Sequence, residues 1–352
     1  SEAIMKQLND KLYAALLAGG GLLLLNGCGD DSNSSPAAKP EPGKISLFAT
    51  DAPVDDVDAV KVTFSRIDLK PRDGDVIQID LDAPVTIENL LELTGSTSQE
   101  IMGDVTVPSG EYNWIRLYVE GGFPDSTVTP EIGNETDLFI PGQQNGNSNG
   151  NPKSLKLTSG FTVAAGGESD FTIDFVLRKG LVKPANADYY LLRPALRLVD
   201  NQQVGAITGN VDGTVVNHPA CAIYSGFGAV YLYEGDLVTA EQTPDDVYDP
   251  GIAAGSDEVD DSTTGPRPIT TAEVKQREDG SYGYDIGFVS AGNYSVSYSC
   301  EAPNDAPESD DDIAFTETIA VNVVADATTN ADFSEEPSEI SGGAEADAGT
   351  GG

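Results

Sequence analysis

The chain has 352 residues, of which 58 are acidic and 19 basic, and its formal net charge is −39. This excess of negative charge repels polyanions, which argues against nucleic-acid binding. His218 is the only histidine, which argues against a multi-histidine metal site or a histidine-dependent catalytic triad. The length accommodates two domains of the usual size of about 100 to 200 residues.

The N-terminal segment has the layout of a secretory signal. If translation begins at Met5, Lys6 and Lys11 precede the apolar run 12–25, which is shorter than the roughly 20 apolar residues of a spanning helix. The sequence Leu-Asn-Gly-Cys that ends at Cys28 resembles the lipobox of bacterial lipoproteins. This resemblance implies a signal peptide over 1–27 and an acylated Cys28. The alternatives are an uncleaved anchor and a buried helix.

In bacterial lipoproteins, the residue after the modified cysteine influences which membrane holds the protein. Gly29 stands there instead of aspartate, and the resemblance to Gram-negative lipoproteins then implies the outer membrane, on its periplasmic or cell-surface face. Residues 28–43 contain little to bury and several prolines, so we expect a disordered tether. Residues 337–352 are expected to form a disordered tail.

Two cysteines remain if Cys28 is lipidated. An exported protein lies in an oxidising compartment, which favours a disulfide between Cys221 and Cys300. The alternative is two separate buried thiols.

The first folded segment, residues 44–203, consists of short strands with turn signals between them. Apolar and polar side chains alternate over 60–64, and the alternation shifts by one at Ile67 and Leu69, which predicts a bulge. This density of strands predicts a β-sandwich. The expected strands are 44–50, 60–69, 76–81, 104–107, 112–120, 137–140, 154–158, 161–165, 170–177 and 189–199, with one short helix near 87–93.

Several motifs follow one another in this segment. They are Ser-Leu-Phe-Ala-Thr-Asp-Ala-Pro at 46–53, and the stretches 60–64, 108–117, 161–163, 174–178 and 192–198. Together they resemble an uncharacterised domain of bacterial lipoproteins that opens with the same Thr-Asp-Ala-Pro sequence. The resemblance covers nearly the whole segment and implies a cell-envelope β-domain. It brings no activity and no catalytic residues.

One strand of this segment is rich in aromatic residues. Its alternation predicts that Tyr112, Trp114, Arg116 and Tyr118 share one face. Three rings and an arginine in a row could bind sugars, because such rings combine apolar area with polar tips. The alternative is that another sheet or loop covers this face.

The second segment, residues 204–336, contains about seven further strands. Three short motifs, at 205–211, 279–282 and 291–296, resemble the prealbumin-like sandwiches of the carboxypeptidase regulatory type. This resemblance implies a structural spacer or an adhesion unit.

Clusters of aspartates suggest calcium binding, because calcium takes six to eight oxygen ligands. Asp55, Asp56 and Asp58 form the first cluster. None of the clusters matches an EF-hand loop, and solvated acidic loops are the alternative. We expect no other cofactor. The further clusters are Asp245, Asp246 and Asp249; Asp257, Glu258, Asp260 and Asp261; and Asp310, Asp311 and Asp312.

These patterns predict an all-β protein with two β-sandwich domains in tandem after a lipoprotein signal and a flexible tether. The expected function is non-enzymatic: a surface binding or structural module of the cell envelope, whose partners are the membrane, through the lipid, and a polysaccharide or another envelope protein. A polysaccharide-binding protein is the first alternative. A calcium-stabilised adhesion module and a carboxylate-dependent glycan hydrolase are the others, since an acid pair is sufficient for glycoside cleavage.

Overall fold

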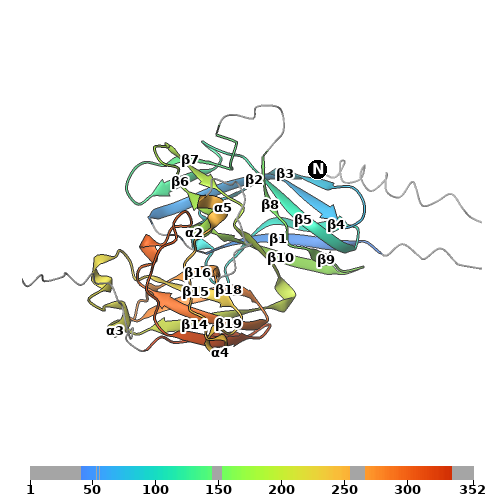
Figure 1. The fold of residues 1–352 in the computed structure, drawn as a ribbon. Coiled ribbons are helices and arrows are strands. Elements are labelled where there is room, and N and C mark those ends of the chain that lie inside the picture. Colours follow the sequence, from blue (N-terminus) through green and yellow to red (C-terminus); the bar gives the residue numbers. More distant parts are fainter. Residues whose placement is uncertain (1–40, 53, 55, 145–152, 254–265, 335–352) are drawn as a thin grey trace, which may run out of the picture. The chain divides into compact units, whose positions relative to one another are not determined.

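A computed structural model describes residues 41–52, 54, 56–144, 153–253 and 266–334 (Figure 1). In this part of the chain the fold is all-β and consists of two sandwiches, which confirms the predicted fold class. The predicted signal peptide, Cys28 and the predicted tail lie outside the described residues. Within the described residues, no helix is both long enough and apolar enough to span a membrane.

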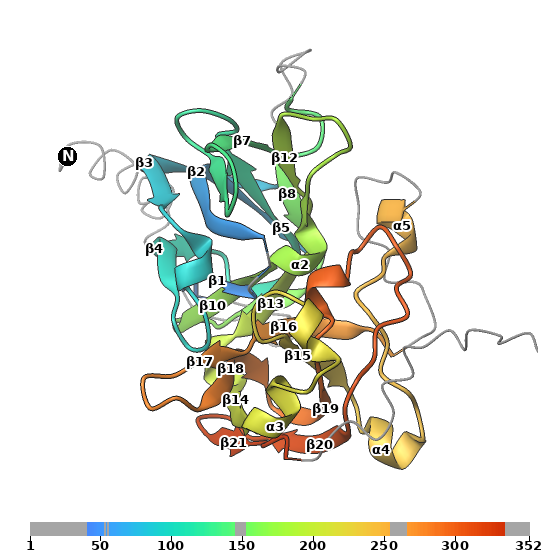
Figure 2. The same ribbon diagram turned by 90° about the vertical axis from the view of Figure 1, so that its left-hand side faces the viewer.

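The first sandwich has two sheets. The smaller sheet has the order β13-β10-β1-β4, and the larger has the order β11-β12-β7-β6-β2-β5-β8, with β3 on β2 and β9 on β5 (Figure 2). Their bounds are β1 (Gly43–Ala52), β2 (Val57–Pro71), β3 (Ile77–Ile87), β4 (Gln99–Val107), β5 (Gly110–Val119), β6 (Thr127–Pro130), β7 (Thr136–Phe139), β8 (Ser154–Leu157), β9 (Phe161–Val163), β10 (Glu168–Val176), β11 (Leu181–Val182), β12 (Tyr189–Leu192) and β13 (Leu196–Asp200), with the short helices η1 (Leu90–Glu92) and α2 (Leu177–Gly180) between them.

The core of this sandwich is formed by the inward side chains of both sheets. Phe64 of β2 and Phe175 of β10 meet with their ring centroids 6.0 Å apart, and both are fully buried. Ile67 and Leu69 of β2 face the same core as Ile115 of β5. The apolar residues of β2 and β5 therefore point into the core, and the residues that alternate with them lie on the opposite face of the sheet.

Two local features of the sequence have clear structural outcomes. The pairing of β2 with β5 shifts register between Phe64 and Arg66, which confirms the bulge predicted from the change of alternation. The single strand expected over 189–199 is instead divided into β12 and β13. Pro194 lies between them, and proline has no N–H to donate to a sheet.

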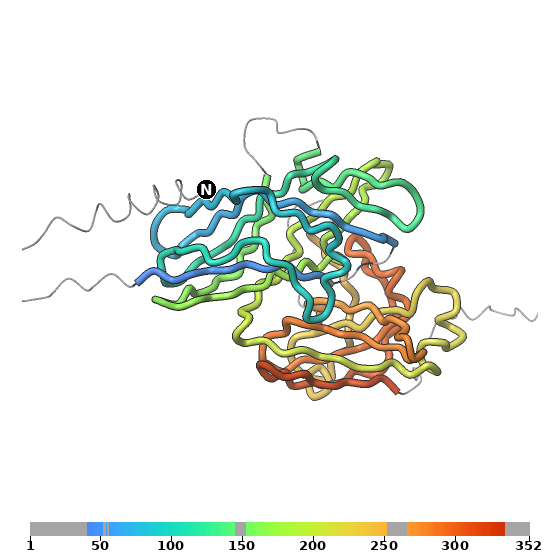
Figure 3. Tube along the Cα trace, turned by 180° about the vertical axis from the view of Figure 1, so that it is seen from behind, coloured from blue at the N-terminus to red at the C-terminus, as the bar shows by residue number. Residues whose placement is uncertain are grey.

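The second sandwich pairs a sheet of order β17-β18-β14-β21 with one of order β16-β15-β19-β20. Figure 3 follows the chain through both sandwiches from blue to red. The bounds are β14 (Val204–Val211), β15 (Ala229–Glu234), β16 (Pro268–Glu273), β17 (Lys275–Gln276), β18 (Tyr282–Ser290), β19 (Gly292–Ser299), β20 (Thr318–Val323) and β21 (Thr328–Asn330), with the short helices η2 (Asn201–Gln203), α3 (Gly213–Val216), η3 (Cys221–Ile223), α4 (Leu237–Ala240), α5 (Pro250–Ala253) and η4 (Ala302–Asn304).

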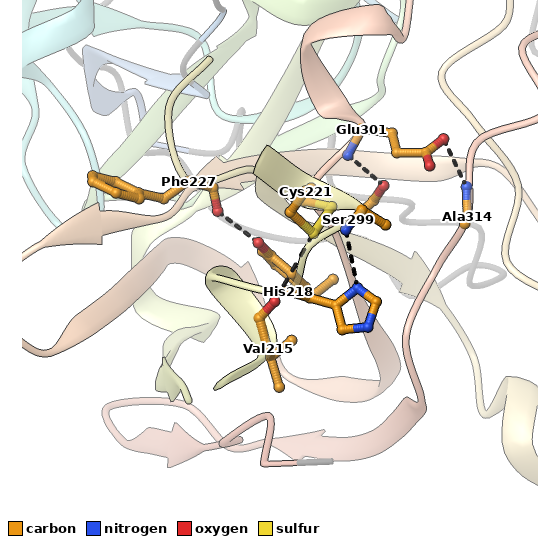
Figure 4. The surroundings of a disulfide bond; sticks show 10 residues. Val215, His218, Cys221, Phe227, Ser299, Glu301 and Ala314 are labelled. Carbon is orange, nitrogen blue, oxygen red and sulfur yellow. Dashed lines mark hydrogen bonds between the residues drawn. A yellow bond between two sulfur atoms is a disulfide. The ribbon is translucent and has the colours of Figure 1, made fainter. Parts of the chain in front are cut away.

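The disulfide joins η3 to the end of β19 in the second sandwich. Cys221 and Cys300 are bonded and largely buried (Figure 4). Beside them, the backbone N–H of Glu301 donates to the Ser299 hydroxyl at 3.1 Å, and the Glu301 carboxylate accepts from the Ala314 N–H at 3.3 Å. The bridge thus holds the segment 213–223 against the end of β19.

Buried polar contacts connect the two sandwiches. Arg178 of α2 is 3% exposed, and its guanidinium donates to the Ala302 carbonyl at 2.7 Å and to the Thr271 hydroxyl at 3.3 Å. The described residues of both sandwiches belong to one compact unit. The predicted boundary between residues 203 and 204 stays a prediction.

We expect the disulfide to contribute about 4 kcal/mol to the free energy of unfolding, because it closes a long loop in the unfolded chain. The bonded cysteines are separated by 79 residues in the sequence. Urea denaturation of the double variant Cys221→Ala/Cys300→Ala should show this loss, and reduction of the unaltered protein should reproduce it. Peptide mapping that finds both cysteines as free thiols in non-reduced protein would contradict the bridge.

Candidate binding surface

Strands β2, β5 and β8 place a set of polar and aromatic side chains on one side of the larger sheet of the first sandwich. Residues Ile67, Ile115 and Leu157 of these strands point into the core, so the alternate residues point outward. We call these outward residues the outer face: Arg66, Asp68, Lys70, Trp114, Arg116, Tyr118 and Lys156.

Tyr112, predicted to lie on this face, faces the core instead. It is 2% exposed and stacks on Phe161 with a centroid distance of 4.8 Å. The reason is a second bulge: Trp114 pairs with Lys70, but Tyr112 pairs with Pro71, so one extra residue, Asn113, reverses the alternation. Burial raises the pKa of Tyr112 to about 12, and its hydroxyl donates to the Pro108 carbonyl at 2.7 Å.

A buried carboxylate organises one end of the outer face. Asp68 is 2% exposed. Its Oδ2 accepts a hydrogen bond from the Tyr118 hydroxyl at 2.8 Å, and its Oδ1 lies 3.1 Å from Nε of Arg66. The Arg66 guanidinium lies over the Tyr118 ring, 3.7 Å from its centroid. Three side chains from two strands therefore fix one another, which reduces the conformational freedom that a ligand would otherwise have to restrict.

Trp114 and Arg116 form the second contact of the outer face. The Arg116 guanidinium lies 4.4 Å from the centroid of the Trp114 ring, within the range of a cation–π interaction. Both side chains are half-buried. Trp114, Arg116 and Tyr118 thus share a face, as the alternation predicts, but Tyr118 is only 8% exposed and its ring lies under the Arg66 guanidinium.

A groove of about 570 Å³ borders the outer face at its Tyr118 end. Arg66 and Tyr118 line it together with Glu120, Phe139 and Lys153. The volume lies in the range of small-ligand sites, about 300 to 1,000 Å³. Alternation within one strand could not locate this groove, because Phe139 and Lys153 come from segments distant in the sequence.

The first acidic cluster is not assembled into a metal-like group among the described residues. Asp55 lies outside them, whereas Asp56 and Asp58 are exposed. Carboxylates within 4.8 Å of one another occur instead in the second sandwich, as Asp246, Asp305 and Asp311, and as Asp245, Asp246 and Asp310. Sequence spacing identified most of these residues, but not Asp305 or the meeting of distant loops.

Hydrogen bonds explain why these acids are buried. Oδ1 of Asp246 accepts from the Tyr248 N–H at 2.9 Å, and Oδ2 accepts from the Asp311 N–H. Asp305 accepts from the Tyr231 hydroxyl at 2.7 Å and from the Val247 N–H at 3.1 Å. These bonds give the group a structural role, and calcium binding by any of the acidic clusters stays a prediction.

The Thr-Asp-Ala-Pro motif also has a structural role. The Thr50 hydroxyl lies 2.7 Å from the Leu93 carbonyl and 2.8 Å from the Thr97 carbonyl, and the Asp51 N–H donates to the Leu93 carbonyl at 3.0 Å. The motif therefore ties the end of β1 to the turn around η1. His218 lies half-buried in a loop, where its Nδ1 accepts from the Ala220 N–H at 3.3 Å.

A family model described as "Domain of unknown function (DUF4382)" matches residues 42–194, which contain the whole outer face. This agrees with the uncharacterised domain predicted from the motifs. A search among curated proteins finds no match.

Three solved structures match the chain at low identity and low TM-score. The TIE protein of Bacillus anthracis is 9% identical over 84% of this chain, with a TM-score of 0.18, and this chain covers 34% of that protein. The minor pilin of Streptococcus agalactiae is 12% identical (82% of this chain, 94% of that one, TM-score 0.17). A Bacteroides eggerthii protein assigned provisionally to cell adhesion is 11% identical (86% and 92%, TM-score 0.20). Likeness at this level carries no argument about function.

Burial gives Asp246 a pH-dependent effect on stability. Loss of hydration raises its pKa to about 6, above the value of about 3.9 expected in the unfolded chain. The folded protein thus binds this proton more tightly, so the contribution of Asp246 to stability falls as pH rises from about 4 through 6.

We therefore expect Asp246→Asn to reduce the loss of unfolding free energy between pH 5 and pH 7, measured by urea denaturation at constant ionic strength. Asp279→Asn is the control, because hydrogen bonds from Ser281 lower the pKa of Asp279 and place its titration below this window. Equal pH slopes for the unaltered protein and Asp246→Asn would contradict the assignment.

Proposed function

We propose that this chain is a non-enzymatic binding module of the bacterial cell envelope, which a lipid on Cys28 holds at the outer membrane and which binds polysaccharide through the outer face. The second sandwich would serve as a spacer or adhesion unit, as its resemblance to prealbumin-like modules implies. The proposal has three parts, the ligand, the anchor and the absence of catalysis, and each has separate support.

The ligand class is supported by one observation above all. Trp114, which is half-buried, lies on the same face as Tyr118, each ring is in contact with an arginine, and the face continues into the groove lined by Tyr118 and Phe139. Aromatic rings give the apolar faces of sugars a flat contact, and the neighbouring polar groups can bond to hydroxyls. An extended face that opens into a groove suits a polymer better than a small molecule.

The anchor is supported by the lipobox-like sequence that ends at Cys28. Acyl chains contribute about 0.8 kcal/mol for each buried CH₂, and two chains suffice for stable attachment. A surface-exposed binding face on a tethered domain would then remain at the membrane while it contacts polymer outside it.

The non-enzymatic assignment is supported by the environment of Asp68, the buried carboxylate of the outer face. Asp68 is buried and engaged by Tyr118 and Arg66, which leaves it poorly placed for proton transfer to a substrate. Incubation with a panel of glycans should release no product. Asp80 and Glu120 both line the groove, and product release that depends on either would replace this assignment by a hydrolase.

We expect Trp114→Ala to weaken retention on polysaccharide affinity gels by about tenfold or more, because the ring supplies the apolar contact area. Tyr224→Ala, which removes a half-buried ring of the second sandwich, should leave retention unchanged. Circular dichroism establishes that both variants fold. Unchanged retention of Trp114→Ala would remove the outer face as the polysaccharide site.

Mass spectrometry of material from native cells tests the anchor. We expect an N-terminus at Cys28 that carries fatty acyl groups, and Cys28→Ser should release the protein from the membrane fraction. An intact, unmodified N-terminus would overturn the anchor while leaving polysaccharide binding open to its own test.

A further inference from the structure

Two cations lie directly opposite each other on the outer face. Arg116 of β5 pairs with Lys156 of the adjacent strand β8. Like charges at directly opposed positions of an antiparallel pair are destabilising, by a few tenths of a kcal/mol up to about 1. In the described part of the chain, neither side chain forms an ion pair. The pair is therefore a local cost that no ion pair among the described residues offsets.

Carboxylate partners are plentiful in so acidic a protein, with 58 acidic residues against 19 basic ones. Several cations away from the outer face have one. Lys44 contacts Asp104 and Glu168, Lys61 contacts Glu88, and Lys275 contacts Glu273.

The nearest candidate partner on the other side of Arg116 is already engaged. Asp68 of β2 is the cross-strand neighbour of Arg116, but its carboxylate bonds to Tyr118 and pairs with Arg66. Arg116 instead lies against Trp114. Lys70 pairs with Trp114 across the strands, and its ammonium donates to the Gly74 carbonyl. Arg116 is thus the cation in contact with the Trp114 ring while it also faces Lys156, and a departure from local consistency of this kind is typical of functional sites.

We infer that the outer face is built for a polysaccharide that carries carboxylates, a polymer of uronic acids. One carboxylate lies between Arg116 and Lys156, where the planar guanidinium can donate two parallel hydrogen bonds, and the sugar that carries it contacts Trp114. The inference rests on the proposed function and specifies its ligand. The net charge of −39 does not prevent this, since salt screens distant charges over about 8 Å at physiological ionic strength.

The test uses a matched pair of polymers. Polygalacturonate carries one carboxylate per sugar, and its fully methyl-esterified form has the same backbone without the charge. Trp114 is the only tryptophan of the chain, so its fluorescence reports on the site directly. We expect polygalacturonate, titrated with a chelator present, to bind at least tenfold more tightly than the ester, the minimum loss for a charge-assisted contact.

Two variants remove the cations one at a time. Arg116→Gln and Lys156→Gln should each lower the affinity for polygalacturonate by about tenfold and lower that for the ester by a smaller factor. Lys44→Gln and Lys275→Gln are the controls, because each removes one positive charge from a pair outside the face, and both should bind as the unaltered chain does.

A charge reversal separates binding from stability. Lys156→Glu gives Arg116 an opposite charge across the strands, so we expect the melting temperature to rise by about 1 to 3 °C while binding of polygalacturonate is lost. A fall in both would indicate that the cation is there for the fold, and would overturn the inference.

The outcomes distinguish the two levels of the argument. Equal binding of both polymers, or full displacement of polygalacturonate by a sulfated polymer of equal charge density, overturns the carboxylate inference and leaves polysaccharide binding in place. Absence of any fluorescence change with either polymer, together with normal gel retention of Trp114→Ala, overturns both.

Discussion

Single-residue insertions decide which side chains of the first sandwich meet water. Successive residues of a strand point to opposite faces, so one extra residue reverses the orientation of everything beyond it. The bulge between Phe64 and Arg66 places Arg66 and Asp68 on the outer face while Phe64 stays in the core, and the insertion of Asn113 turns Tyr112 into the core. The composition of the outer face follows from these two insertions.

Much of the fold is readable from local patterns, and the exceptions have a common cause. The bulge in β2 could be predicted because aliphatic residues on both sides of it reveal the change of phase. The bulge at Asn113 could not, because Tyr112 and Trp114 are both amphipathic and suit either face. In the second sandwich the backbone of Phe288 adopts a φ of 49°, and Val289 is fully buried whereas Phe288 is half-buried.

Local patterns predict some residues of the candidate site and fail to predict others. Its members on β5 follow from alternation within one strand, but their partners on β2 and β8 depend on strand register, which local sequence does not determine. The contact of Asp68 with Tyr118 and the opposition of Arg116 and Lys156 are both properties of register. Contacts between residues distant in the sequence, such as Asp246 and Asp305, cannot be predicted from local patterns for the same reason.

The position of β8 gives Lys156 a second consequence. In the described part of the chain β8 is the last strand of its sheet, with backbone groups available for pairing with another molecule. Lysine on such a strand discourages edge-to-edge association, because two copies would bring their ammonium groups together. A neutral or apolar residue in place of Lys156 would relieve the like-charge opposition to Arg116, but it would also favour aggregation. Lys156 therefore contributes to the solubility of the protein.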